Sequence, residues 1–101
     1  MIEIKNSDIH GKGVFSTEYL PAGTLLVCDV IVFPKDIIID SVYRYPWYRD
    51  DGCICAGFGS FLNHSNEPNI VISSIDKKNL TKTFKTILDI NMGCEILMKY
   101  M

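Results

Sequence analysis

The amino-acid sequence predicts a mainly β protein with little helix, folded as a single domain over residues 1–101. Three observations support this fold class. Apolar residues alternate with a period of two, as in half-buried strands, rather than with the helical period of about 3.6. Turn-forming residues recur at roughly ten-residue spacing and separate about seven short strands. The length of 101 residues, with 48% hydrophobic and 22% charged residues, suits one globular core.

The expected strands are the apolar runs between these turns. The longest run covers residues 24–33, where β-branched residues dominate, and Pro34 ends it because proline cannot donate to a β-ladder. Residues 37–39 fit either a strand or the start of a helix, since periodicity cannot separate the two at that length. A short first strand is expected to carry Ile2 and Ile4 on one face. Further strands are expected at residues 14–16, 70–73, 80–88 and 96–100.

Polar and glycine-containing segments predict the turns. Residues 57–59 read Gly-Phe-Gly, which indicates close approach of two backbone segments rather than a regular strand interior. Residues 20–23 and 90–93 share an apolar-x-x-Gly pattern and each precedes an apolar run. Two similar turn-plus-strand units explain this likeness without an internal repeat. The remaining turns are expected at residues 6–8, 51–52, 63–69, 76–79 and 92–93.

Charge and hydrophobicity argue against several function classes. The net charge is −2, the sequence pI is about 5.5, and residues 77–78 form the only adjacent basic pair, so direct nucleic-acid binding is not expected. No run of about 18 apolar residues predicts a membrane span. Residues 1–5 lack the apolar core of a secretory signal. We therefore expect an intracellular, reducing compartment, either cytoplasm or nucleus.

The four cysteines are Cys28, Cys53, Cys55 and Cys94, and in such a compartment they are expected to be free thiols. Most would serve as small, buried apolar side chains. A zinc site built from Cys53, Cys55 and His64 is the alternative. Its spacing is poor, because structural zinc sites place roughly two to four residues between paired cysteines. We therefore expect no metal.

Two other site patterns are weak. Ser65, His64 and Asp76 could be drawn as a catalytic triad, but adjacent side chains in a turn rarely face one another and no nucleophile-elbow pattern surrounds the serine. Residues 11–13, Gly-Lys-Gly, are too short for a phosphate-binding loop. They also lack the third glycine and the following helix of a dinucleotide-binding fingerprint.

Residues 63–69 read NHSNEPN, which resembles the signature of SET-domain protein lysine methyltransferases. The likeness covers residues 9–100, and the size is similar to that of the minimal SET proteins of large DNA viruses and some bacteria. It implies a SET-domain fold of the β-clip type, with several small sheets and a C-terminal pseudoknot made by the last two motifs. The other segments that resemble family motifs, in the family's order, are HGKGVF at 10–15, YRYPW at 43–47, GFGSFLNH at 57–64 and GCEILMKY at 93–100.

The resemblance implies a protein-lysine N-methyltransferase that transfers a methyl group from S-adenosylmethionine to a lysine side chain, with histones as candidate substrates. It implies Tyr100 as the catalytic tyrosine and Tyr43 as a wall of the lysine channel. Asn63 would contact the amino-acid end of the cofactor, and His64 would meet the adenine through its backbone. Glycines at positions 11 and 13 would let the backbone approach the cofactor. The residues expected to bind S-adenosylmethionine are Lys12, Gly13, Val14, Leu62, Asn63 and His64.

The chain departs from the family pattern at four positions. Asn66 replaces a frequent cysteine, Cys94 stands where the first glutamate usually lies, and Lys99 stands where an acidic or small residue is common. Met101 is reached where relatives continue into a lid over the adenine. We therefore expect a single SET domain without a C-terminal lid. A catalytically impaired SET-like domain that binds cofactor or peptide is the alternative function. The need to brace residues 96–101 predicts a homodimer, as in the minimal viral relatives.

Overall fold

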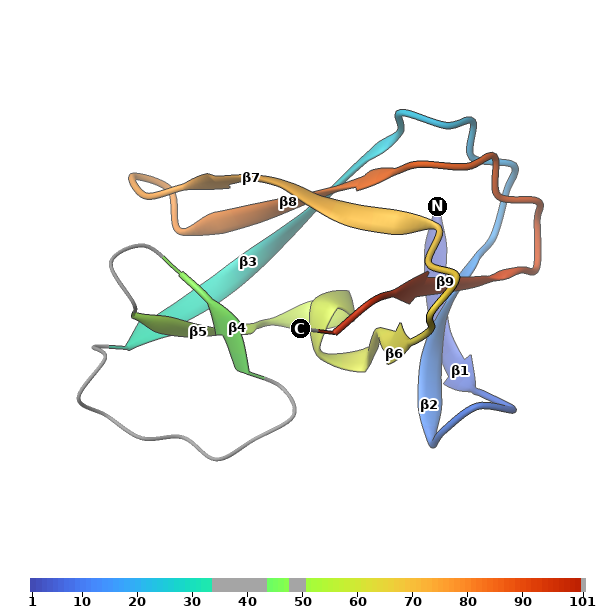
Figure 1. Cartoon of the computed structure of the whole chain (residues 1–101), viewed down its shortest axis with the longest axis horizontal. Coiled ribbons are helices and arrows are strands. Elements are labelled where there is room, and N and C mark those ends of the chain that lie inside the picture. The colour runs from blue at the N-terminus through green and yellow to red at the C-terminus, as the bar shows by residue number, and fades with distance from the viewer. Residues whose placement is uncertain (34–43, 48–50, 101) are drawn as a thin grey trace.

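Nine β-strands and one short 3-10 helix occupy residues 1–33, 44–47 and 51–100, the part of the chain that the computed structural model describes (Figure 1). The mainly β fold class with little helix is confirmed. No helix among these residues is long and apolar enough to cross a membrane. The elements are β1 (Ile2–Asn6), β2 (Lys12–Ser16), β3 (Leu25–Phe33), β4 (Arg44–Pro46), β5 (Gly52–Cys55), η2 (Gly57–Phe61), β6 (Asn63–His64), β7 (Ile70–Asp76), β8 (Thr81–Thr86) and β9 (Glu95–Met98).

The strands form two sheets (Figure 1). One is four-stranded with the order β1-β2-β9-β6, and the other is five-stranded with the order β4-β5-β3-β8-β7. β3 is the centre of the larger sheet, because it pairs with β8 through residues 25–29 and with β5 through residues 30–33. The long strand predicted for residues 24–33 is therefore present, and its length lets it join two ladders.

The C-terminal strand β9 lies between β2 and β6, antiparallel to β2 and parallel to β6. Asn63 pairs with Leu97, and His64 pairs with Met98. The contact continues past β6, where the Ser65 N–H donates to the Met98 carbonyl at 3.0 Å. Asn63 and His64 were expected in a turn; they form a strand because β9 offers them a ladder. This close association of the last two motifs fits the implied pseudoknot.

Asn69 fastens the same segment to β9 through its side chain. The Asn69 amide nitrogen donates to the Glu95 carbonyl at 2.9 Å, and the amide oxygen accepts the Leu97 N–H at 2.8 Å. The Asn69 backbone N–H also donates to the Leu97 carbonyl at 3.0 Å. One carboxamide thus provides hydrogen-bond partners for two backbone groups of β9.

The two similar turns at residues 20–23 and 90–93 lie against each other. Leu20 and Ile90 exchange both of their backbone hydrogen bonds at 2.8 Å, and both side chains are buried. Gly23 and Gly93 have φ values of 92° and 88°, which favour glycine. The likeness in sequence therefore reflects two equivalent turns that pair with each other.

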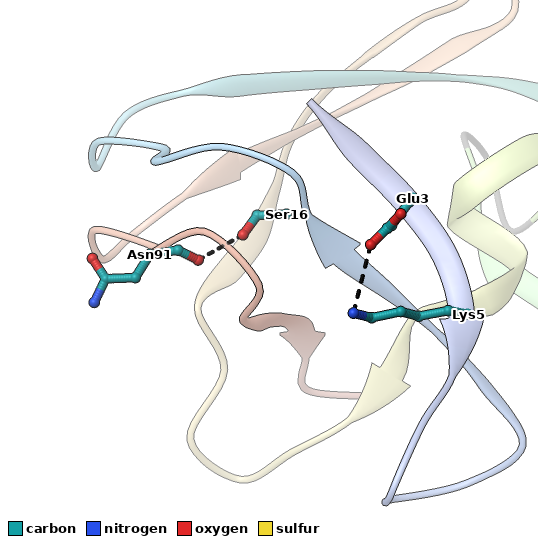
Figure 2. Close-up of polar contacts among 4 residues, drawn as sticks. All are labelled: Glu3, Lys5, Ser16 and Asn91. Carbon is teal, nitrogen blue, oxygen red and sulfur yellow. Dashed lines mark hydrogen bonds and ion pairs between the residues drawn. The ribbon is translucent and has the colours of Figure 1, made fainter.

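The second of these turns is fixed to β2 by Ser16 (Figure 2). The buried Ser16 hydroxyl donates to the Asn91 carbonyl at 2.6 Å, and the Gly93 N–H donates to the Ser16 carbonyl at 2.9 Å. Since β9 begins just after this turn, Ser16 helps to set where β9 enters its sheet. The Glu3–Lys5 ion pair in the same view joins two exposed side chains at 3.5 Å, and such pairs contribute little to stability.

The apolar core lies mainly against the five-stranded sheet. Phe84 is fully buried and meets the Tyr45 and Phe58 rings edge-on, with centroids 6.1 and 5.7 Å away. All four cysteines are free thiols, and three of them are buried, as expected. The buried core residues are Val14, Leu20, Leu26, Cys28, Val30, Tyr45, Cys53, Cys55, Leu62, Ile70, Phe84, Ile90, Ile96 and Met98.

One local expectation was wrong. Gly52 does not end a tight turn at residues 51–52; it opens β5, where β3 and β4 pair with it on either side. Ile2 and Ile4 share one face of β1, as expected, and Ile4 is exposed on this edge strand. The run at residues 37–39, expected as strand or helix start, lies outside the described residues.

Candidate functional site

A pocket of about 190 Å³ opens at the edge of the four-stranded sheet. Its lining comes from three segments that are far apart in the sequence, around residues 10–12, 60–63 and 100. The pairing of β9 with both β2 and β6 brings them together. The lining residues are His10, Gly11, Lys12, Ser60, Phe61, Leu62, Asn63 and Tyr100.

Asn63 is the buried polar residue of this pocket, with only 6% of its surface exposed. The two hydrogens of its amide nitrogen are shared among three acceptors, which are the carbonyls of His10 at 3.1 Å and Lys12 at 3.2 Å and the Glu95 carboxylate at 2.8 Å. These three acceptors fix the orientation of the amide group. Its oxygen accepts no hydrogen bond from the described residues, so it is left for an N–H group in the pocket.

Glu95 links Asn63 to the N-terminal strands. One carboxylate oxygen accepts from Asn63 and the other accepts from the Ser7 hydroxyl at 2.7 Å. A Cβ atom on Gly13 would lie 2.3 Å from the Glu95 oxygen Oε2. A side chain at position 13 would therefore displace the Glu95 carboxylate from its present place.

Tyr100 is held at both ends by the segment that contains Asn63. Its hydroxyl donates to the Leu62 carbonyl, and its backbone N–H donates to Nδ1 of His64 at 2.9 Å. The His64 and Tyr100 ring centroids are 5.2 Å apart. Tyr100 remains 40% exposed, which leaves one side of the phenol accessible to a substrate.

The structure brings together four of the residues predicted to form the site, namely Lys12, Leu62, Asn63 and Tyr100. Gly13, Val14 and His64 were also predicted, but they are not part of this lining. Gly13 lies against Glu95, and His64 contacts Tyr100 beside the pocket. Val14 is fully buried in the core, so its side chain does not face the pocket. Tyr43, expected to line the lysine channel, lies outside the described residues.

Gly11, whose backbone was expected to approach the cofactor, is also part of the lining, whereas sequence reasoning missed three of its residues: His10, Ser60 and Phe61. Each precedes a predicted residue by one to three positions, so their place beside the motifs was the available signal. It also missed Glu95, although that residue lies in the resembling segment 93–100.

The residues of the zinc alternative lie apart. Cys53 and Cys55 are in the core, and His64 is beside the pocket. Among residues 1–33, 44–47 and 51–100, no group of three or more His, Cys, Asp or Glu residues could hold a metal ion.

The buried cysteines instead surround Lys82. Its side chain is 1% exposed, and its ammonium lies 4.7 Å from the Tyr45 ring centroid. Burial lowers the pKa of Lys82, while Cys53 and Cys55 favour its charged form. Burial also raises the pKa of Tyr45, whose hydroxyl donates to the Gly59 carbonyl at 2.7 Å. This cluster belongs to the core and not to the pocket.

The sequence matches the SET domain family over residues 11–101. This chain belongs to the SET-domain family. Among proteins of known function, it is 27% identical to the H3 lysine-37 specific histone-lysine N-methyltransferase of Schizosaccharomyces pombe. That similarity covers 98% of this chain and 72% of the yeast protein.

Solved structures agree on the fold of this SET domain. A Plasmodium falciparum protein proposed to be a histone methyltransferase has a TM-score of 0.85 at 24% identity, covering 99% of this chain and 92% of that one. KRYPTONITE in complex with mCHG DNA and SAH has a TM-score of 0.77, and its complex with mCHH DNA, an H3(1-15) peptide and SAH has one of 0.75. Both are 27% identical and cover 98% of this chain but 23% of KRYPTONITE.

Proposed function

We propose that this chain is a protein-lysine N-methyltransferase that uses S-adenosylmethionine and methylates a histone lysine. Membership of the SET-domain family and the similarity to the yeast H3 lysine-37 enzyme support lysine methylation. KRYPTONITE structures that contain SAH, the product of S-adenosylmethionine, support the cofactor. The structural observation that carries the proposal is that Asn63 and Tyr100 line one pocket.

The residues of the pocket fit the amino-acid end of S-adenosylmethionine. The Asn63 amide oxygen, which no described residue uses, can accept a hydrogen bond from the amino group. Gly11 has a φ of 47°, and nothing lies within 4 Å of the place where its Cβ would be, so the backbone there is open to a ligand. When bound, S-adenosylmethionine supplies a methyl group on a positively charged sulfur.

Tyr100 is the proposed catalytic residue. Its hydroxyl donates its proton to the Leu62 carbonyl, and a phenol oxygen of this kind can accept an N–H of the substrate amine. A fixed hydrogen-bond acceptor for the amine restricts the direction of the lone pair on its nitrogen. Such alignment of two reactants is a large part of the rate gain in bimolecular transfer.

Replacing Tyr100 with phenylalanine tests this role. Because that variant lacks the acceptor oxygen, we expect kcat to fall by about 100-fold, the usual scale for losing one positioned polar group. The dissociation constant of S-adenosylmethionine should change less than about threefold, since Asn63 is untouched. Transfer of a labelled methyl group to histone H3 peptides and calorimetry provide the two measurements.

Tyr19→Phe is the matched control, because Tyr19 is an exposed tyrosine that is not part of the pocket lining. It should retain wild-type kcat. Equal activity of the Tyr100 and Tyr19 variants would contradict the proposed role of Tyr100. A protein that binds S-adenosylmethionine but methylates no lysine would instead support the alternative, a catalytically impaired binding module.

The proposal also predicts a pH dependence of the chemical step. The substrate amine must be neutral to attack, and free lysine has a pKa of about 10.4. The single-turnover rate should therefore rise from neutral to mildly alkaline pH. A flat profile with chemistry limiting would argue against direct attack by a lysine amine.

We also propose that the protein forms a homodimer and works in a reducing compartment. Three large apolar side chains on the outer face of β3, those of Leu25, Val27 and Ile31, are 54%, 59% and 63% exposed and offer a surface for association. The free thiols of the buried cysteines support a reducing environment. Light scattering at micromolar concentration measures the oligomeric state, and a strict monomer would refute the dimer.

A further inference from the structure

His64 contacts the proposed catalytic tyrosine through its ring. Nδ1 of His64 accepts the Tyr100 backbone N–H at 2.9 Å, and the two rings lie 5.2 Å apart between centroids with an interplanar angle of 58°. The bond spans 36 positions of sequence. It therefore ties the end of the chain to β6 at the edge of the pocket.

This hydrogen bond continues the ladder between β6 and β9. His64 pairs with Met98 at the last residue of β9, so Tyr100 lies two residues beyond the regular strand. Residues at the end of an element fray unless a side chain or a tertiary contact holds them. The imidazole supplies an acceptor for the backbone at the point where the ladder stops.

The hydrogen-bond partners of His64 specify one neutral tautomer. Since Nδ1 accepts the Tyr100 N–H, it carries no proton, and the ring proton lies on Nε2. The Asn66 amide oxygen is 3.3 Å from Nε2 and can accept a hydrogen bond from the Nε2–H group. Asn66 therefore favours the tautomer that Tyr100 needs. This gives a role to a residue that departs from the family pattern.

The same short segment holds the other end of the tyrosine, because the Leu62 carbonyl accepts its hydroxyl. We propose that the imidazole of His64, kept in its Nε2–H tautomer by Asn66, is a positioning residue that sets the direction of the Tyr100 phenol. The inference rests on the proposed role of Tyr100 in methyl transfer. His64 would act on methyl transfer only through Tyr100, without touching a reacting atom.

Two substitutions of His64 separate positioning from bulk. His64→Asn keeps an acceptor at the place of Nδ1, because the carboxamide oxygen branches from the same carbon as the imidazole nitrogen. His64→Leu keeps an apolar side chain of similar reach without an acceptor. We expect kcat to fall about tenfold in His64→Leu, the scale of one lost hydrogen bond, and less than about threefold in His64→Asn. The dissociation constant of S-adenosylmethionine should stay within about threefold in both, since the backbone is unchanged.

Equal kcat values for the two variants would overturn the proposal, whether both match the wild type or both are impaired. Asn66→Ala is a milder test should either His64 variant fold poorly. This variant keeps the His64 ring but removes the Asn66 oxygen that favours the proton on Nε2. We therefore expect kcat to fall about threefold and the dissociation constant of S-adenosylmethionine to stay unchanged. Wild-type kcat in Asn66→Ala would contradict the role of Asn66.

Amide hydrogen exchange of Tyr100 in the protein without substrate provides a readout that does not depend on methyl transfer. Protection of the Tyr100 N–H should be lost in His64→Leu and kept in His64→Asn. If protection follows this pattern while Tyr100→Phe retains full activity, the positioning contact stands and the proposed catalytic role of Tyr100 fails. If Tyr100→Phe is inactive but protection is the same in all variants, the positioning inference fails alone.

Discussion

The two sheets of this SET domain are held together by different kinds of interaction. In the five-stranded sheet, Phe84 packs against Tyr45 and Phe58 among buried thiols and aliphatic side chains. In the four-stranded sheet, the contacts around the pocket are polar and link Ser7, Glu95 and Asn63 in one chain of hydrogen bonds. The first sheet resembles an ordinary core, and the second resembles a frame around a binding site.

Tight packing is therefore the main source of stability in the five-stranded sheet, whereas ligand binding depends on the polar contacts around the pocket. Packing errors in the five-stranded sheet should destabilise the fold because its atoms have no room to move. Substitutions among the polar residues around the pocket should mainly weaken ligand binding, since carboxylates and amides at a pocket edge can exchange protein partners for water. The same kind of substitution in the two regions should therefore give different phenotypes.

Gly59→Ala tests the tightly packed side and should have the largest effect. A Cβ at Gly59 would lie 2.5 Å from Cβ of Cys55 and 3.0 Å from Sγ of Cys28, and neither atom can move freely in the core. We expect a loss of about 3 kcal/mol in the free energy of unfolding, at the upper end for overpacking. Urea titration gives this value. A loss below about 1 kcal/mol would mean that the core adapts and that the contrast between the sheets is wrong.

Asn69→Ala tests whether the polar side also carries stability where it holds β9. The variant leaves the Glu95 carbonyl and the Leu97 N–H without their side-chain partner. At about 1 kcal/mol for each lost hydrogen bond, we expect a loss of about 2 kcal/mol in the free energy of unfolding. Asn91→Ala is the matched control, because Asn91 bonds Ser16 through its backbone carbonyl and its side chain points away (Figure 2). Equal losses in both variants would contradict the role of the Asn69 carboxamide.

Gly13→Ala places the same chemical change as Gly59→Ala on the polar side. Its Cβ would displace the Glu95 carboxylate and with it the bonds to Asn63 and Ser7. We expect S-adenosylmethionine to bind about tenfold more weakly, which corresponds to about 1.4 kcal/mol, with a smaller loss of stability than in Gly59→Ala. Calorimetry and urea titration measure the two effects.

A double-mutant cycle identifies the cause of that weakening. If the clash with Glu95 is responsible, Gly13→Ala should add little to the effect of Glu95→Ala, so the two losses are not additive. Additive losses would show that position 13 acts on the ligand directly, which is the interpretation drawn from the sequence alone.

The sequence predicted the elements more reliably than their partners. The strand over residues 24–33 and the pocket residues Asn63 and Tyr100 follow from alternation and from a specific motif. The packing of Glu95 against Gly13 was not predicted, because Glu95 is distant in the sequence and touches Gly13 only after β2 pairs with β9. Likewise, Asn63 and His64 have turn-forming neighbours, and only the pairing with β9 makes them a strand. Local patterns cannot specify such non-local pairs.

Lys82 is the exception on the apolar side and supports the last and smallest prediction. Its side chain is buried among Cys53, Cys55 and Tyr45, and burial lowers the pKa of its ammonium. A buried charge costs free energy that an apolar side chain of similar shape does not. We therefore expect Lys82→Met to raise the free energy of unfolding by about 1 kcal/mol at pH 7.

The sign of the pH dependence follows from the lowered pKa. Below its folded-state pKa, Lys82 is charged in both states, and the fold bears the full cost of the buried ammonium. As the pH rises from that value towards the unfolded pKa of about 10.4, the folded lysine loses its proton first and the cost is relieved. The advantage of Lys82→Met over the wild type should thus shrink between neutral and alkaline pH, as urea titrations at both pH values would measure. An advantage that stays constant or grows, or a methionine variant less stable than the wild type, would show that the contacts with the thiols and the Tyr45 ring outweigh the cost of burial. The five-stranded sheet would then also depend on a polar contact for its stability, and it would differ from the four-stranded sheet only in how many such contacts it has.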